Sequence, residues 1–183
     1  MPRARTAWLA NFLTWGDAFC AHDLSMGCAS LSQFAARIDA LPGAFPGVSD
    51  SALCLISDRV RAQWPDARWV ILWRDPAKVR FSLQAMGAYP GLAKVGPDLA
   101  VEIVSRVEES VKSFAKDPRA MFVEYDDLDS MQKLYSIWQW CLRGRVPWCA
   151  ERAAQLHRMK VEIIPERYEV DLVAVRSLYE SAA

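Results

Sequence analysis

One stretch of the sequence decides the fold: Arg68-Trp69-Val70-Ile71-Leu72-Trp73-Arg74-Asp75-Pro76-Ala77-Lys78-Val79-Arg80-Phe81-Ser82. Its five consecutive large apolar residues, 69–73, predict a strand buried on both faces of a parallel sheet. Pro76 stands where the first turn of a helix tolerates proline. Because α/β folds build anion sites at the carboxyl ends of such strands, Arg74 is a candidate ligand of an anion. Ser82 follows eight positions later, about two helical turns on.

The composition indicates one ordinary globular domain over residues 1–183. Hydrophobic residues make up 52% and charged residues 24%, which argues against disorder. Basic and acidic residues balance at 22 each, so a broad nucleic-acid surface is not expected, whereas a small basic pocket for one nucleotide is compatible with this balance.

The cysteines and the apolar runs limit the other kinds of protein that the sequence could encode. The five cysteines include no Cys-x-x-Cys pair, so we expect neither a metal site nor a disulfide framework. No apolar run is long enough to span a bilayer. We therefore expect a cytoplasmic protein without a membrane partner; the sequence leaves its oligomeric state open.

Short apolar runs alternate with amphipathic segments along the whole chain. Strands are expected at 18–21, 48–51, 69–73 and 120–123, with an edge strand as an option at 159–164. Helices are expected at 6–14, 31–41, 51–63, 76–86, 99–115, 130–142 and 170–181, and a loop at 45–47. This alternation predicts a three-layer α/β/α sandwich with a mostly parallel sheet.

The amino terminus reads Met1-Pro2-Arg3-Ala4-Arg5-Thr6-Ala7-Trp8-Leu9. A helix that begins near Thr6 presents unpaired amides and the positive end of its dipole to an anion. Arg3 and Arg5 add charged donors at the same place. This combination suits a 5′-phosphate or phosphosulfate group; two solvated arginines on a frayed terminus are the alternative.

Three short motifs together resemble those of the sulfotransferases, enzymes with a P-loop NTPase-like fold. The family's phosphate loop has the form Pro-Lys/Arg-Ser-Gly-Thr-Thr-Trp-Leu, which Pro2, Arg3, Thr6, Trp8 and Leu9 match and from which Ala4, Arg5 and Ala7 depart. Arg74 and Ser82 match the pair that grips a 3′-phosphate in the family. The segment 124–128, Glu-Tyr-Asp-Asp-Leu, resembles the family's Tyr-Glu-Asp-Leu. The strict Walker pattern of ATP- and GTP-binding loops is absent.

The resemblance implies the donor 3′-phosphoadenosine 5′-phosphosulfate and the product adenosine 3′,5′-bisphosphate, with no metal. Arg3 would neutralise charge on the sulfuryl group. The loop residues Arg5, Thr6 and Ala7 would hold the 5′-phosphate, and Trp8 and Tyr125 would lie near the adenine. In this fold a central strand directly precedes the phosphate loop. The sequence lacks that first strand, so we expect that the true start lies upstream or that neighbouring strands close the gap.

His22-Asp23 ends the second expected strand, where carbohydrate-modifying sulfotransferases place a catalytic glutamate. His22 and Asp23 are therefore the candidate bases, unless Asp23 caps the next segment or pairs with an arginine. The segment 49–51, Ser-Asp-Ser, either reaches the site or caps the following helix. Three functions stay open: sulfuryl transfer to a hydroxyl or amine, a kinase-like phosphotransfer on the same broad fold, and a non-catalytic nucleotide-binding or scaffold role.

Overall fold

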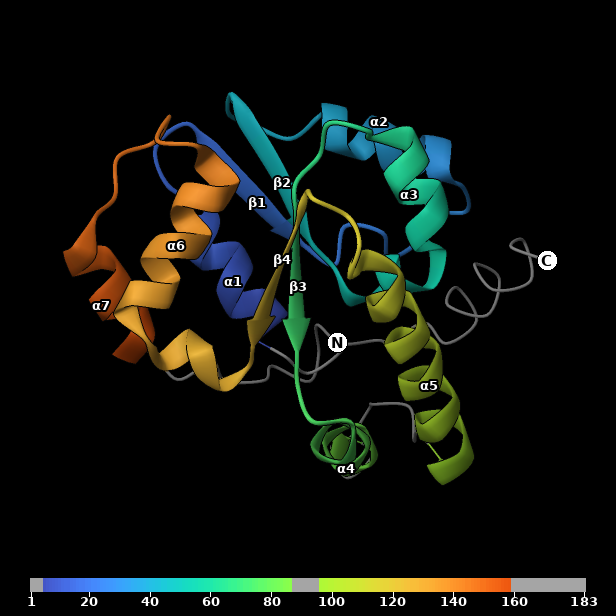
Figure 1. Cartoon of the computed structure of the whole chain (residues 1–183). Coiled ribbons are helices and arrows are strands. Elements are labelled where there is room, and N and C mark those ends of the chain that lie inside the picture. Colours follow the sequence, from blue (N-terminus) through green and yellow to red (C-terminus); the bar gives the residue numbers. More distant parts are fainter. Residues whose placement is uncertain (1–4, 87–95, 159–183) are drawn as a thin grey trace.

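The computed structural model describes residues 5–86 and 96–158 (Figure 1). In chain order its elements are α1 (Thr6–Leu13), β1 (Ala18–His22), α2 (Leu31–Asp39), β2 (Phe45–Ser49), the 3₁₀ helix η1 (Ser51–Ile56), α3 (Ser57–Gln63), β3 (Trp69–Trp73), α4 (Pro76–Met86), α5 (Pro97–Phe114), β4 (Ala120–Glu124), the 3₁₀ helix η2 (Asp126–Asp129), α6 (Met131–Leu142) and α7 (Ala150–Arg158).

The four strands form two separate two-stranded parallel sheets. β1 pairs with β2, and β3 pairs with β4. Figure 1 shows all four strands running from the top of the view toward the bottom, with α1, α6 and α7 on one side and α2, α3 and α5 on the other. The described part of the chain is therefore a mixed α/β fold whose strands all point one way.

The strand and helix of the fold-deciding stretch, β3 and α4, have the bounds that the sequence predicts. Ile71 and Leu72 are buried, while Trp69, Val70 and Trp73 are half-buried. Asp75 starts α4 by accepting a hydrogen bond from the Ala77 amide at 2.7 Å. A short polar cap and a proline in the first turn thus stop the strand and begin the helix.

One predicted loop was wrong, and one helix was missed. Phe45-Pro46-Gly47 was expected as a loop but belongs to β2. The Phe45 amide donates to the Asp17 carbonyl at 3.1 Å, and in the resulting ladder Pro46 faces away from β1, so its missing N–H costs this pairing nothing. The helix α7 was not predicted at all. The segments 159–164 and 170–181 lie outside the described residues.

An aromatic cluster holds α1 against α6 and α7. Phe12, only 1% exposed, stacks on Trp8 with ring centroids 5.2 Å apart and meets the edge of Trp138 at 5.6 Å. The indole of Trp138 donates to the Val146 carbonyl at 2.9 Å. Aromatic pairs of this geometry stabilise beyond their buried area. The cluster therefore sets the position of α1, and with it the position of the amino end of that helix.

The substitution Phe12→Ala should lower the free energy of unfolding by about 3 to 5 kcal/mol, because it leaves a cavity in this cluster. Phe81→Ala is the matched control: Phe81 is 74% exposed, and its truncation should change stability by less than about 0.5 kcal/mol. Urea unfolding followed by tryptophan fluorescence measures both values. Equal losses for the two variants would contradict this description of the core.

Candidate functional site

The carboxyl ends of the strands and the amino end of α1 lie at one edge of the molecule (Figure 1). His22 ends β1, Ser49 ends β2, and Arg74 and Tyr125 directly follow β3 and β4. The Ser49 hydroxyl donates to the carbonyl of Thr6 at 2.8 Å and so ties the start of α1 to the end of β2. This edge is where parallel α/β sheets bind ligands.

Two arginines from distant parts of the sequence meet at the ring of Tyr125. The guanidinium carbon of Arg5 lies 4.7 Å from the ring centroid, and that of Arg74 lies 4.5 Å from it. Arg5 also donates to Asp129 at 2.6 Å. Burial alone would lower the pKa of Arg5, but its hydrogen bonds to Asp129 and Tyr125 raise it. Two arginines, whose side chains keep their charge at all ordinary pH values, thus lie together at this edge, and guanidinium groups are common ligands of phosphate-like anions.

The backbone of Arg5 adopts a conformation that favours glycine. Its φ is 60° and its ψ is 31°, in the left-handed region, which costs a non-glycine residue about 1 kcal/mol. The Arg5 backbone therefore makes a glycine-like turn, and its side chain reaches Asp129 and Tyr125. No side chain of the described residues caps α1, so its first turn presents its amides to this edge.

The two base candidates form a chain of contacts with Thr6. The Thr6 hydroxyl lies 3.1 Å from Nε2 of His22, and Nδ1 of His22 lies 3.4 Å from a carboxylate oxygen of Asp23. The tautomer of His22 decides which atom of the first pair donates. Asp23 has a φ of 50°, so a second strained residue stands at this edge. Strain of this kind gathers at functional sites.

Burial and a neighbouring carboxylate shift the proton affinities of this pair. Burial, and then the charge of Asp50, raises the pKa of Asp23 to about 7. Burial lowers the pKa of His22, and Asp50 opposes that change in part. Asp50 is held in place because its carboxylate accepts from the amides of Ser25 and Ala52, both at 2.9 Å. A carboxyl that titrates near neutral pH is suited to general acid–base chemistry.

The other predicted site residues lie as follows. Trp8 is 6% exposed and donates from its indole to the Leu156 carbonyl at 2.9 Å, so it faces α7 and not the two arginines. Ala7 is half-buried in the first turn of α1, and Ser82 is half-buried on α4. Arg3 lies outside the described residues.

Sequence reasoning missed two features of the site and left a third one open. It did not find the partner of Arg5, because Asp129 is one of several acidic residues in the run 126–129 and no spacing distinguishes it. It did not foresee the contact between Thr6 and His22. It left open whether Asp50 caps a helix or reaches the site, and the structure gives it both roles.

Comparison with known proteins found no matching family model, no similar curated protein and no similar solved structure. Within residues 5–86 and 96–158, no helix has both the length and the apolarity needed to cross a membrane. Over the same residues, no three His, Cys, Asp or Glu side chains are grouped so as to hold a metal ion. The function of the site therefore has to be inferred from its geometry.

The substitution Asp23→Asn should change the pH dependence of stability. An ordinary aspartate titrates near 3.9, and burial raises the pKa of Asp23 to about 7, so the folded state binds its proton more tightly than the unfolded state. Below pH 4 the Asp23 carboxyl is protonated in both states and does not change the free energy of unfolding. As the pH rises from 4 to 7, the carboxyl lowers the free energy of unfolding increasingly. Asparagine removes this penalty and also tolerates a positive φ.

Relative to the unmodified protein, Asp23→Asn should therefore gain stability between pH 5 and pH 8. We expect about 1 to 2 kcal/mol, because solvent screens a carboxyl that is only partly buried. Asp39→Asn, which removes an exposed carboxylate at the end of α2, is the control for loss of one negative charge. Denaturant unfolding at each pH gives the curves. Parallel curves for Asp23→Asn and the unmodified protein would show that this carboxyl is not perturbed.

Proposed function

We propose that the protein binds 3′-phosphoadenosine 5′-phosphosulfate at the edge where its strands end and transfers the sulfuryl group to a hydroxyl or amine acceptor. One observation carries this proposal: Arg5 and Arg74 meet on the ring of Tyr125, beside the uncapped amino end of α1. The proposed architecture is a P-loop-like three-layer sandwich, which the helices on both sides of the strands support (Figure 1).

The chemistry of the residues fits such a nucleotide. Its two phosphate positions require separate groups of cations and amides, because each carries negative charge that must be matched on binding. Arg74 stands at the end of β3 and Arg5 at the start of α1, so the two guanidinium groups come from different elements. Both guanidinium groups lie over the ring of Tyr125, which therefore holds them close to each other.

The proposed roles follow from these positions. Arg74 and Ser82 bind the 3′-phosphate, while Arg5 and the amides of Thr6 and Ala7 bind the 5′-phosphate. Tyr125 lies against the adenine. Trp8 takes no part in base stacking in this proposal, because its indole is buried and bonded to the Leu156 carbonyl. Arg3 keeps its predicted role of neutralising the sulfuryl oxygens.

The transfer itself needs one proton acceptor. The acceptor oxygen or nitrogen attacks sulfur, the bond from sulfur to the 5′-phosphate oxygen breaks, and adenosine 3′,5′-bisphosphate leaves with that electron pair. The proton of the acceptor passes to His22 or Asp23. Both suit this task because burial lowers the pKa of His22, and burial together with the charge of Asp50 raises the pKa of Asp23 to about 7.

Ligand-dependent thermal stability tests the nucleotide. At a hundredfold excess over Kd, adenosine 3′,5′-bisphosphate should stabilise the protein by about 2.7 kcal/mol. For a chain of this size that is a rise of about 5 to 10 °C in Tm. Arg74→Ala should weaken binding by about 10- to 100-fold, since a charge-assisted bond is lost. Arg74→Lys should weaken binding less than Arg74→Ala does, because lysine keeps the positive charge but cannot form the paired hydrogen bonds of a guanidinium group.

Arg106→Ala is the matched control, because Arg106 is exposed on α5 and paired with Glu102. Its binding should equal that of the unmodified protein. ATP and ADP are measured in parallel. A shift with ATP and none with the bisphosphate would favour the kinase-like phosphotransferase and would refute the proposed donor. No shift with any nucleotide would refute nucleotide binding.

Transfer of labelled sulfate to a panel of hydroxyl and amine acceptors tests the enzymatic part. His22→Gln and Asp23→Asn should retain the bisphosphate-induced shift in Tm. If His22 is the base, His22→Gln should lower the transfer rate by about 10²- to 10⁴-fold, and if Asp23 is the base, Asp23→Asn should do so. If the bisphosphate binds and the unmodified protein transfers sulfate to none of the acceptors, the non-catalytic nucleotide-binding role replaces the enzymatic one.

A further inference from the structure

A cavity of about 750 Å³ lies between β2 and β3. Its lining includes all of β2 and residues 69–72 of β3, and α1, η1 and α5 also contribute side chains. The cavity reaches from the edge where the strands begin, at Arg68 and Arg145, to the edge where they end, at Thr6 and Ser49. Pockets of this size bind small organic molecules. The proposed function uses only the edge where the strands end.

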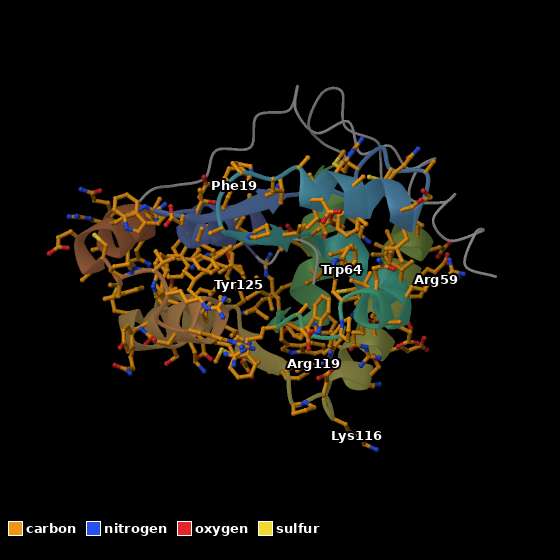
Figure 2. The ribbon with its side chains drawn as sticks, turned by 90° about the horizontal axis from the view of Figure 1, so that it is seen from above. Phe19, Arg59, Trp64, Lys116, Arg119 and Tyr125 are labelled. Atoms are coloured by element: carbon orange, nitrogen blue, oxygen red, sulfur yellow. The ribbon has the colours of Figure 1, made fainter. Side chains whose placement is uncertain are left out.

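Four arginines line the end of the cavity where the strands begin. Arg68 and Arg119 directly precede β3 and β4. Arg143 and Arg145 closely follow α6, and the guanidinium carbon of Arg145 lies 5.3 Å from the ring centroid of Phe45, the first residue of β2. Figure 2 looks down on this end of the molecule, with Arg119 labelled. Guanidinium groups from three separate parts of the sequence therefore line the same end of the cavity.

Three of these arginines, Arg68, Arg143 and Arg145, form no ion pair within residues 5–86 and 96–158. Arg68 donates to the neutral carbonyl of Trp140 at 2.7 Å, and its guanidinium carbon lies 4.7 Å from the centroid of the Trp140 ring. All three side chains are exposed, so a ligand that enters the cavity can reach them. Guanidinium groups bind carboxylates through charge-assisted hydrogen bonds.

The lining also contains two carboxylates, Asp50 and Asp66. Asp50 follows β2 at the opposite end of the cavity and accepts from two backbone amides, both at 2.9 Å. At the arginine end, Arg119 donates to Asp117 at 2.8 Å. This bond, and to a smaller extent the charge of Asp66, raises the pKa of Arg119. The carboxylates near the arginines thus act on Arg119, and the other three arginines remain available to a ligand.

Between its two ends the cavity is lined mainly by apolar side chains, among them Leu9, Val60 and Phe114. Cys20 and Cys141 belong to the same lining, and burial raises the pKa of both thiols to about 12. Both thiols are therefore neutral near neutral pH and behave as small apolar groups. An apolar chain can lie in this part of the cavity without burying an unpaired charge.

One buried polar atom of the lining lacks a partner. The indole N–H of Trp69 finds no acceptor among the described residues. Trp69 directly follows Arg68, and its ring centroid lies 5.7 Å from that of Phe114. A buried donor without an acceptor lowers the stability of the fold. An oxygen atom of a bound molecule can accept this hydrogen bond, which indicates a ligand that carries an acceptor close to the arginines.

We propose that this cavity binds an amphipathic carboxylate, such as a medium-chain fatty acid. The carboxylate oxygens accept from Arg68, Arg143 and Arg145 and from the indole of Trp69, and the apolar chain lies between β2 and β3. A neutral apolar molecule leaves these donors without an acceptor. A small polar anion leaves the apolar part of the cavity in contact with water. Only an anionic head joined to an apolar chain matches both parts of the lining.

Isothermal titration of the full chain with decanoate, without nucleotide and below the concentration at which micelles form, tests the ligand. Decanoate should bind about tenfold more tightly than octanoate, because two further methylene groups leave water. Decan-1-ol and decyltrimethylammonium have the same chain without the negative charge. Both should bind at least about tenfold more weakly than decanoate, because neither offers the arginines a carboxylate.

The double substitution Arg143→Asn and Arg145→Gln tests the head group. Arg143 has a φ of 51°, which asparagine tolerates. Decanoate binding should weaken by about 10- to 100-fold, since two charge-assisted bonds are lost, while the binding of decan-1-ol should stay the same. Arg106→Ala is the matched control, because Arg106 does not line the cavity, and its affinity for decanoate should equal that of the unmodified protein.

The indole N–H signals of the tryptophans, followed by NMR, report on the hydrogen bond itself. The signal of Trp69, assigned from its loss in Trp69→Phe, should move downfield as decanoate is added. The Trp138 indole already donates to the Val146 carbonyl at 2.9 Å, so its signal is the internal reference and should not move.

Three results would overturn the proposal. Equal affinities for decanoate, decan-1-ol and decyltrimethylammonium would mean that the cavity takes apolar chains without recognising a carboxylate. Unchanged decanoate binding in the double variant would mean that the arginines take no part. No binding of decanoate to the unmodified protein would mean that the cavity is not a site for such molecules. The double variant should keep the bisphosphate-induced shift in Tm, so this proposal and the proposed function can fail separately.

Discussion

The hydrogen bond from Ser49 to the Thr6 carbonyl positions the rest of the site, because it ties the beginning of α1 to the end of β2. The aromatic cluster around Phe12 packs the same helix against α6, and the Trp8 indole bonds it to the Leu156 carbonyl of α7. Between these two anchors α1 has little freedom to shift. Its uncapped first turn is consequently held at the edge where all four strands end, and Arg5 is carried to the ring of Tyr125.

Strain and charge concentrate at this edge while the rest of the described fold is regular. Three non-glycine residues within 5–86 and 96–158 have a positive φ, and two of them, Arg5 and Asp23, lie at this edge. The pKa of Asp23 is raised by burial and by Asp50 at the same place. A positive φ at a non-glycine residue and a shifted pKa both lower the stability of the folded state. Such features are concentrated at sites that bind a ligand or carry out a reaction. The site is thus distinguished by its energetics as well as by its residue types.

The agreement between sequence and structure depends on how local each signal is. β3 and α4 were predictable because an apolar run, an Asp cap and a proline act within a few residues of one another. β2 begins earlier than the sequence predicts. A strand accepts Pro46 only where its backbone faces away from β1, and no local pattern shows which way it faces because β1 lies elsewhere in the sequence. Helix α7 carries only a narrow apolar stripe, and its contact with Trp8 comes from the other end of the chain.

By itself, the sequence determined the alternation of strands and helices and the presence of Arg74 at the end of a strand. These follow from hydrophobic period, caps and turn residues, which act locally. Only the tertiary structure decided that Arg5 and Arg74 share Tyr125, that His22 contacts Thr6, and that β2 and β3 stay apart. Such pairings depend on how helices and strands that are distant in sequence pack together. No local sequence pattern specifies which side chain will meet which partner.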